Sequence, residues 1–142
     1  MSISSKQADQ AHASATSQAL AYDRAGQYVK ERAVLETYMK TNPPKKYRYP
    51  ADISLGDLTY NAGDDKAALR WYKDAQATGG KPQLLDVLGL AQATEATGDK
   101  TGAIRYLKQA ITLTEAEKVD QASIPSLVLS YQQQISYLES TP

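Results

Sequence analysis

The amino-acid sequence predicts an all-α fold, a row of antiparallel helix hairpins closed by one further helix. Apolar residues recur at spacings of three and four from about Lys6 to Ser140, as they do on one face of a helix. No segment alternates apolar and polar residues in the manner of a half-buried strand. A Gly-Asp turn occurs at Gly63 and again at Gly98, 35 residues later, which indicates repeated units.

The clearest unit is the stretch LGDLTYNAGDDKAALRWYKDAQATGG, residues 55–80. Its first helix is expected to end at Gly63, because glycine enters the left-handed conformation at little cost. Asp64 is the expected N-cap of the second helix, since its carboxylate can accept from an unpaired backbone N–H. The apolar residues of the two helices fall at helical spacing; they are Leu55, Leu58, Ala62, Ala68, Leu69, Tyr72 and Ala75.

A second copy spans residues 84–117 and a third, poorer copy lies on the N-terminal side, with its turn at Gly26. Ala103 and Ala110 of the second copy stand at the offsets of Ala68 and Ala75, and small residues at these positions let two helices cross closely. The N-terminal copy departs from this pattern. It has Glu31 and Tyr38 where the other copies have alanine.

This pattern resembles the tetratricopeptide repeat, a helix–turn–helix unit of about 34 residues. The resemblance divides one domain, residues 1–142, into repeats at about 12–45, 49–82 and 84–117 and a capping helix at about 123–140. It implies a right-handed α-α superhelix. It also implies that a partner peptide or protein binds against the first helices of the hairpins, in the concave groove.

Two segments outside the repeats have their own signatures. Asn42-Pro43-Pro44 interrupts the helical pattern, and a basic-aromatic loop is expected after it. Asp52 is the expected N-cap of the next helix. That loop is either a second contact site for an anionic partner or a solvated connector; its residues are Lys45, Lys46, Tyr47, Arg48 and Tyr49. The last helix places one apolar stripe toward the array; the stripe comprises Ile124, Leu127, Val128, Tyr131, Ile135 and Leu138.

The composition argues against a catalytic or metal-binding function. With no cysteine and one histidine, neither a disulfide nor a standard zinc site is expected. His12 is expected to be a solvent-exposed helix residue, and no Gly-rich run precedes a Lys-Ser/Thr pair to bind phosphate. We therefore expect a protein that is not an enzyme and uses no cofactor or metal.

Charge and hydropathy do not identify the cellular compartment of the protein. The formal net charge is zero, with eight Lys/Arg against four Asp/Glu in residues 1–50 and the reverse excess, eight against twelve, in residues 51–142. Neutrality argues against a dedicated nucleic-acid binder. No apolar run approaches the length of a membrane span. The sequence fits a cytoplasmic domain as well as the exported part of a membrane-anchored protein.

The resemblance assigns the groove to the first helix of each hairpin. The residues it places there are Leu20, Asp23 and Arg24, then Ile53, Asp57, Tyr60 and Asn61, and then Leu88, Gln92 and Glu95. Tyr60 is the expected anchor, because aromatic side chains often dominate an interface. Only Asn61 fits the Lys/Asn/Arg set with which some relatives clamp a peptide carboxylate, so no such clamp is expected. The alternatives are a structural or assembly subunit, such as the soluble part of an anchored protein, and, less favoured, a nucleic-acid binder.

Overall fold

A computed structural model describes residues 4–117 and 123–142, and within these residues all regular structure is α-helical. This confirms the all-α prediction. The seven helices of the described chain are α1 (Ser5–Arg24), α2 (Tyr28–Lys40), α3 (Lys45–Asn61), α4 (Asp65–Gly79), α5 (Leu84–Ala96), α6 (Lys100–Ala116) and α7 (Ile124–Ser140).

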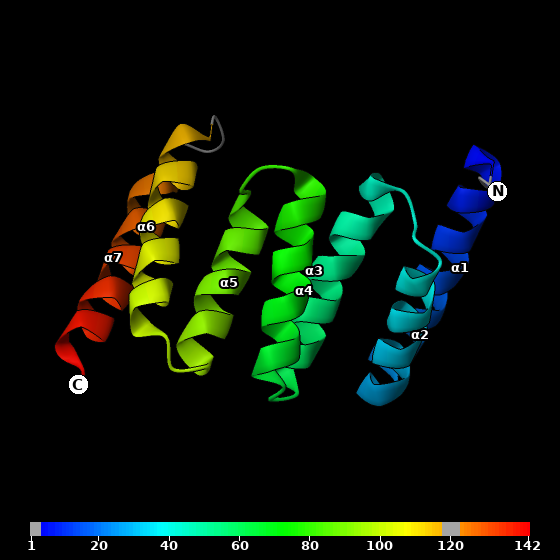
Figure 1. Cartoon of the computed structure of the whole chain (residues 1–142), viewed down its shortest axis with the longest axis horizontal. Helices are drawn as coiled ribbons and strands as arrows, with labels where there is room; N and C mark the ends of the chain where they lie inside the picture. The colour runs from blue at the N-terminus through cyan, green and yellow to red at the C-terminus, as the bar shows by residue number, and fades with distance from the viewer. Residues whose placement is uncertain (1–3, 118–122) are drawn as a thin grey trace.

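The helices pack in chain order. The pairs α1/α2, α3/α4 and α5/α6 are hairpins, α7 packs on α6, and α3 also contacts α5. Figure 1 shows the helices side by side in an elongated row, with the N- and C-terminal ends at opposite ends of the molecule. The contact between α2 and α3 is less extensive than that between α4 and α5, so the first hairpin is the most loosely joined.

The predicted turns form as expected. Gly63 and Gly98 have φ of 84° and 92°, which favours glycine because a Cβ would be strained there. Asp64 then accepts a hydrogen bond from the N–H of Ala67, and Asp99 accepts one from the N–H of Gly102. Both aspartates therefore cap their helices as the sequence predicts.

The predicted helix crossings are also confirmed. Ala68, Ala75, Ala103 and Ala110 are completely buried. In the first hairpin the bulkier Tyr38 is buried as well, and its hydroxyl lies 3.5 Å from Nδ1 of His12 on α1. The larger side chain thus finds a polar partner where the other hairpins simply pack closely.

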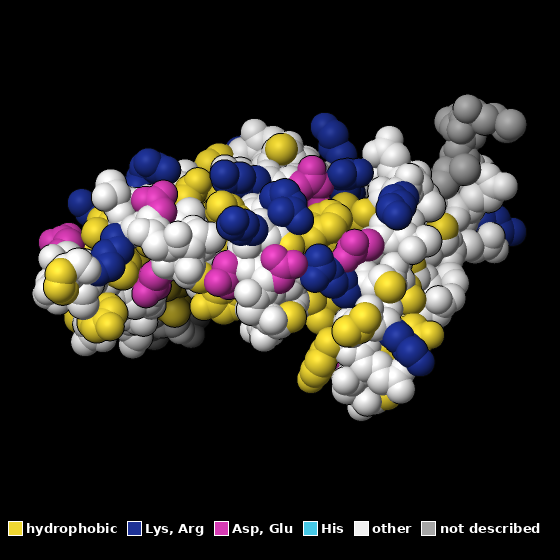
Figure 2. Space-filling model, turned by 60° about the horizontal axis from the view of Figure 1, so that its bottom comes forward, with side chains coloured by type: hydrophobic (Ala, Val, Ile, Leu, Met, Phe, Trp, Pro, Cys, Tyr) yellow, Lys and Arg dark blue, Asp and Glu magenta, His cyan; other side chains and the backbone are white. Residues whose placement is uncertain are grey.

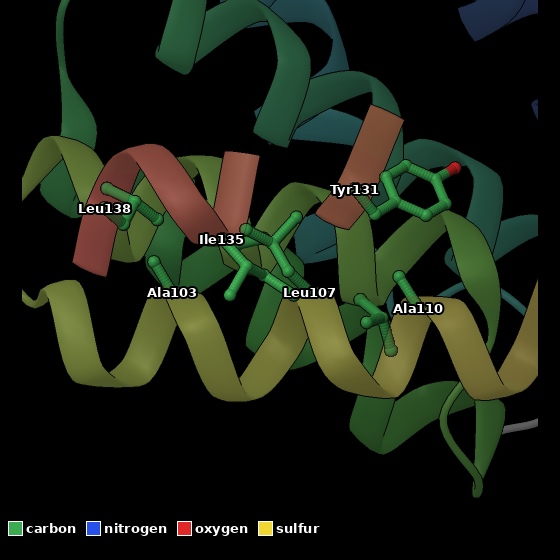
Figure 3. Packing of buried hydrophobic residues seen from close by; sticks show 8 residues of the cluster. Ala103, Leu107, Ala110, Tyr131, Ile135 and Leu138 are labelled. Carbon is green, nitrogen blue, oxygen red and sulfur yellow. The ribbon is translucent and has the colours of Figure 1, made fainter. Parts of the chain in front are cut away.

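The last helix covers the third hairpin with only part of its predicted stripe. Figure 3 shows Tyr131, Ile135 and Leu138 of α7 facing Ala103, Leu107 and Ala110 of α6, and all six are buried in one cluster. Toward the start of α7 the packing loosens: Ile124 and Val128 are half-buried, and Leu127 is exposed. The prediction of a stripe buried along the whole helix is therefore wrong for this end.

The prediction of a basic-aromatic loop after Pro44 is wrong. Residues 45–50 are the first turns of α3, with Pro50 inside the helix and Pro44 at the N-cap position. Asp52 is consequently not an N-cap but a fully buried residue in the middle of α3. Tertiary contacts override the local break signal, because side chains of this segment bond to three other helices.

Candidate functional site

The segment from Lys45 to Tyr49 uses its polar groups within the fold. Arg48 Nη2 lies 3.0 Å from Asp74 Oδ2 on α4, and the Tyr49 hydroxyl donates to Asp86 of α5 at 2.9 Å. The segment therefore joins neighbouring helices, while Lys45 and Lys46 are exposed at the start of α3.

Two further residues of this segment contact α1. The Tyr47 hydroxyl donates to Asp9, and Lys46 lies 3.7 Å from the same carboxylate. The Tyr47 ring stacks on His12 with ring centroids 3.9 Å apart. His12 is accordingly half-buried between rings rather than solvent-exposed, which corrects the prediction made for it.

The ten residues predicted for the groove all lie on α1, α3 and α5, but they do not form one continuous cavity. Asp23, Asp57 and Asn61 line the same cavity, at the junction of α1, α2 and α3. Glu95 lines a different one, beside α7.

The other six predicted residues lie outside the junction cavity. Tyr60 and Ile53 pack against the cluster around Tyr72, and Leu88 packs against the cluster of α6 and α7. Leu20, Arg24 and Gln92 are exposed on α1 and α5, away from the cavity lining.

The junction cavity has a volume of about 640 Å³, within the usual range of ligand pockets. Its polar wall is made by Asp23, Glu31, Ser54, Asp57 and Asn61, and its apolar wall by Tyr28, Leu58 and Ala62. A smaller, mainly apolar cavity of about 380 Å³ adjoins it and shares the residues Tyr28, Leu58 and Ala62. Both cavities exist because α2 and α3 touch only sparingly.

Glu31 is the unusual member of this wall. It is 9% exposed, and its Oε1 has no hydrogen-bond partner. Burial raises the pKa of the Glu31 carboxyl, and the nearby Asp23 carboxylate raises it further. Sequence reasoning missed Glu31 as a site residue, although its departure from the alanine pattern was the signal.

The carboxylate of Asp57, unlike that of Glu31, is exposed and is oriented by a hydrogen bond from another helix. The Tyr72 hydroxyl donates to Asp57 Oδ1 at 2.5 Å, which fixes the direction of this exposed carboxylate. Burial raises the pKa of Tyr72 and the hydrogen bond to Asp57 raises it further, so the hydroxyl stays a donor. Asp57 therefore keeps its other oxygen available on the cavity side of α3.

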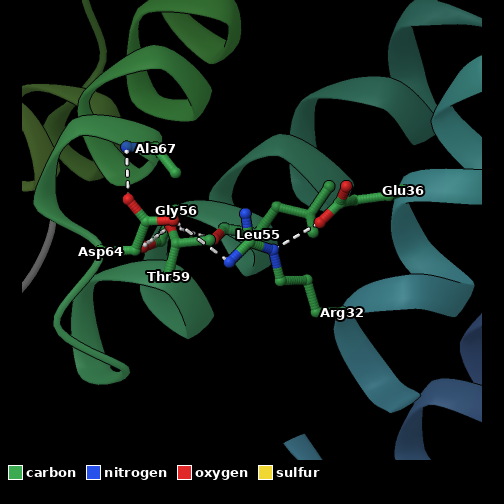
Figure 4. Close-up of polar contacts among 7 residues, drawn as sticks. All are labelled: Arg32, Glu36, Leu55, Gly56, Thr59, Asp64 and Ala67. Carbon is green, nitrogen blue, oxygen red and sulfur yellow. Dashed lines mark hydrogen bonds and ion pairs between the residues drawn. The ribbon is translucent and has the colours of Figure 1, made fainter. Parts of the chain in front are cut away.

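Arg32 forms a further polar link between the first two hairpins. Figure 4 shows its guanidinium reaching Glu36 on its own helix and Asp64 beyond the end of α3, where Nη1 lies 3.3 Å from Oδ2. Asp64 also caps α4, and Thr59 donates to the carbonyl groups of Leu55 and Gly56. This network fixes α2 beside the junction cavity. Arg32 is paired with two carboxylates, Glu36 and Asp64, that do not line that cavity.

Figure 2 shows one face of the molecule as a mixture of charges, with Lys and Arg side chains gathered over its middle and Asp and Glu among them. Exposed apolar side chains lie along the part that projects at the lower right of this view. Among the residues that the structure describes, no three acidic or histidine side chains are placed to hold a metal ion together. No described helix is long and apolar enough to cross a bilayer.

Comparisons with family models and curated proteins identify no relative of this chain. No protein-family model matches the chain, and no curated protein has a significantly similar sequence. Functional inference therefore rests on the sequence pattern and on the geometry of the site.

Proposed function

We propose that this chain is a non-catalytic protein-interaction module of the tetratricopeptide-repeat type. Three helix hairpins packed in chain order with a closing helix support the repeat assignment. The observation that carries the proposal is the junction cavity, since it opens between consecutive first helices, α1 and α3, where partners of such arrays bind.

The lining of this cavity suits a protein segment. Asn61 is exposed at the end of α3 and offers both a donor and an acceptor to an extended backbone. Tyr28, Leu58 and Ala62 add apolar surface next to it. A cavity with a few convergent polar groups and an apolar wall is the usual form of a recognition site.

The test begins with affinity capture of partners from the cells that produce the protein, followed by titration of the purified partner. Asn61→Ala and Tyr28→Ala are expected to weaken binding at least about tenfold, because both remove side chains that line the junction cavity. Thr112→Ala, at an exposed position of α6, is the control and is expected to bind as the wild type does.

If both variants fold and keep full affinity, recognition does not occur in the junction cavity. The outer face formed by α2, α4 and α6 would then become the place to search. A circular dichroism spectrum of each variant checks that the helices are intact.

A further inference from the structure

Three carboxylates surround the junction cavity without a cation among them. Asp23 comes from α1, Glu31 from α2 and Asp57 from α3. The ion pairs of the described residues involve other carboxylates, namely Asp9, Glu36, Asp64 and Asp74. Arg32, on the same helix as Glu31, is paired with Glu36 and Asp64. The cavity is therefore lined by acidic side chains from three helices and by no cation.

The buried oxygen of Glu31 is an independent sign of a missing ligand. Buried polar atoms are nearly always hydrogen-bonded, and a buried carboxylate without a partner is costly. Glu31 stands where the second and third hairpins have the fully buried Ala68 and Ala103, so packing alone does not demand a carboxylate there. A cation at this place would satisfy it.

The geometry favours an organic cation over a metal ion. The carboxylates of the described residues do not converge closely enough to hold a metal ion. A guanidinium presents five N–H donors in a plane and can reach carboxylates on different helices, and an ammonium presents three. Tyr28, which is 57% exposed, places an aromatic ring in the wall, and such rings attract organic cations.

The adjoining apolar cavity decides between a side chain and a free polyamine. It continues the wall of Tyr28, Leu58 and Ala62 and adds Val29 and Ala33. Its lining also includes Arg32 and Glu36, which pair with each other. A partner segment can fill it with the apolar residue next to the basic one, whereas a polyamine has only short methylene runs between its charged nitrogens.

We propose that the junction cavity binds an arginine or lysine side chain of a partner protein, with Asp23, Glu31 and Asp57 as its anionic ligands. An apolar neighbour in the partner sequence occupies the adjoining cavity. This inference rests on the proposed function and names the chemistry that the module recognises.

The test measures fluorescence anisotropy of labelled heptapeptide pools mixed with the full chain. One pool has arginine fixed at its centre and leucine beside it, and a matched pool has citrulline, which has nearly the shape of arginine without its charge. We expect the arginine pool to bind at least about tenfold more tightly, because charge-assisted bonds in a partly buried site are lost with citrulline.

Variants locate the binding. Glu31→Gln and Asp23→Asn are expected to lower the affinity for the arginine pool to that for the citrulline pool. Glu115→Gln, which removes an exposed carboxylate of α6 outside the cavity, is expected to change nothing. Asp23 is exposed, so its variant keeps the test valid even if Glu31→Gln does not fold.

The outcomes separate this inference from the proposed function. Equal binding of the arginine and citrulline pools overturns the cationic inference and leaves the peptide-binding function standing. Binding of neither pool overturns the cationic inference, and the titration of the captured partner then decides whether the protein-interaction function stands. Arginine binding that survives Glu31→Gln and Asp23→Asn places the cation elsewhere, and spermidine binding as tightly as the peptides would replace the side chain by a free polyamine; both results contradict the proposal.

Discussion

At the scale of single residues, Asp52 shows how burial changes a carboxylate. It is fully buried in α3, its Oδ1 has no hydrogen-bond partner, and Oδ2 accepts from Thr78 at 3.4 Å. Burial raises the pKa of Asp52 to about 8, and the neighbouring Asp74 adds to the rise, while Arg48 opposes it. At neutral pH Asp52 therefore keeps its proton in the folded protein.

The first prediction follows from this shift. An unfolded aspartate ionises near pH 3.9, so between about pH 4 and pH 8 the folded chain binds more protons than the unfolded chain. Consequently this residue lowers the free energy of unfolding as pH rises through that window, by up to about 1.4 kcal/mol per pH unit. We expect Asp52→Asn to remove the dependence and to be more stable than the wild type at pH 8.

Urea unfolding at pH 4, 6 and 8 measures this. Asp65→Asn, which removes a carboxylate from the first turn of α4, is the control and is expected to follow the wild-type curve. Parallel curves for the wild type and Asp52→Asn would mean that Asp52 is ionised in the folded protein.

At the scale of elements, Tyr72 determines how α3, α4 and α5 fit together. Its ring is almost completely buried, and a Cβ built on either Gly56 of α3 or Gly89 of α5 would overlap it. The two glycines thus make room for one ring between two helices. The hydroxyl reaches past them to Asp57, so the packing at this point also orients a cavity residue.

The second prediction concerns this contact. Gly89→Ala gains up to about 1 kcal/mol of helix propensity, but overpacking against a rigid ring costs about 1–3 kcal/mol. We expect a net loss of stability in a thermal melt. In the background of Tyr72→Leu, which leaves space beside Gly89, the same change is expected to become neutral or stabilising. Equal effects in both backgrounds would show that Tyr72 is not what Gly89 accommodates.

At the scale of the whole molecule, the array is closed at one end and loosely joined near the other. The closing helix α7 buries Tyr131, Ile135 and Leu138 against α6, as arrays of this kind require at their last repeat. The sparse contact between α2 and α3 leaves the junction cavity open. The interior of the array is therefore tight at its C-terminal end, and the candidate site lies where packing is least complete.

The third prediction tests the closing helix. Leu138→Ala is expected to lower the free energy of unfolding by about 2–5 kcal/mol, because Leu138 is 4% exposed and its removal leaves a cavity over α6. Leu129→Ala lies on the same helix but at a position 54% exposed, and it is expected to change stability by less than about 0.5 kcal/mol. Similar losses in chemical denaturation would mean that α7 does not pack as the structure has it.

Part of the candidate site was predictable. Asp23, Asp57 and Asn61 follow from the resemblance to the repeat family, carried over by register, because a repeat places equivalent residues on equivalent faces. Glu31 and Tyr28 did not follow, since the second helix of a hairpin is expected to pack inward and its departures look like imperfect core residues. Only the distance between α2 and α3 makes them part of a cavity wall.

The sequence by itself determined the helical hairpins, their glycine turns, the aspartate caps and the buried alanines, because each depends on local conformation or on spacing along one helix. Only the tertiary structure decided that residues 45–50 are helical, since their polar groups bond to distant helices and outweigh a local break signal. It also decided that Asp52 is buried and that carboxylates from α1, α2 and α3 line one cavity, because both depend on how separate helices approach one another.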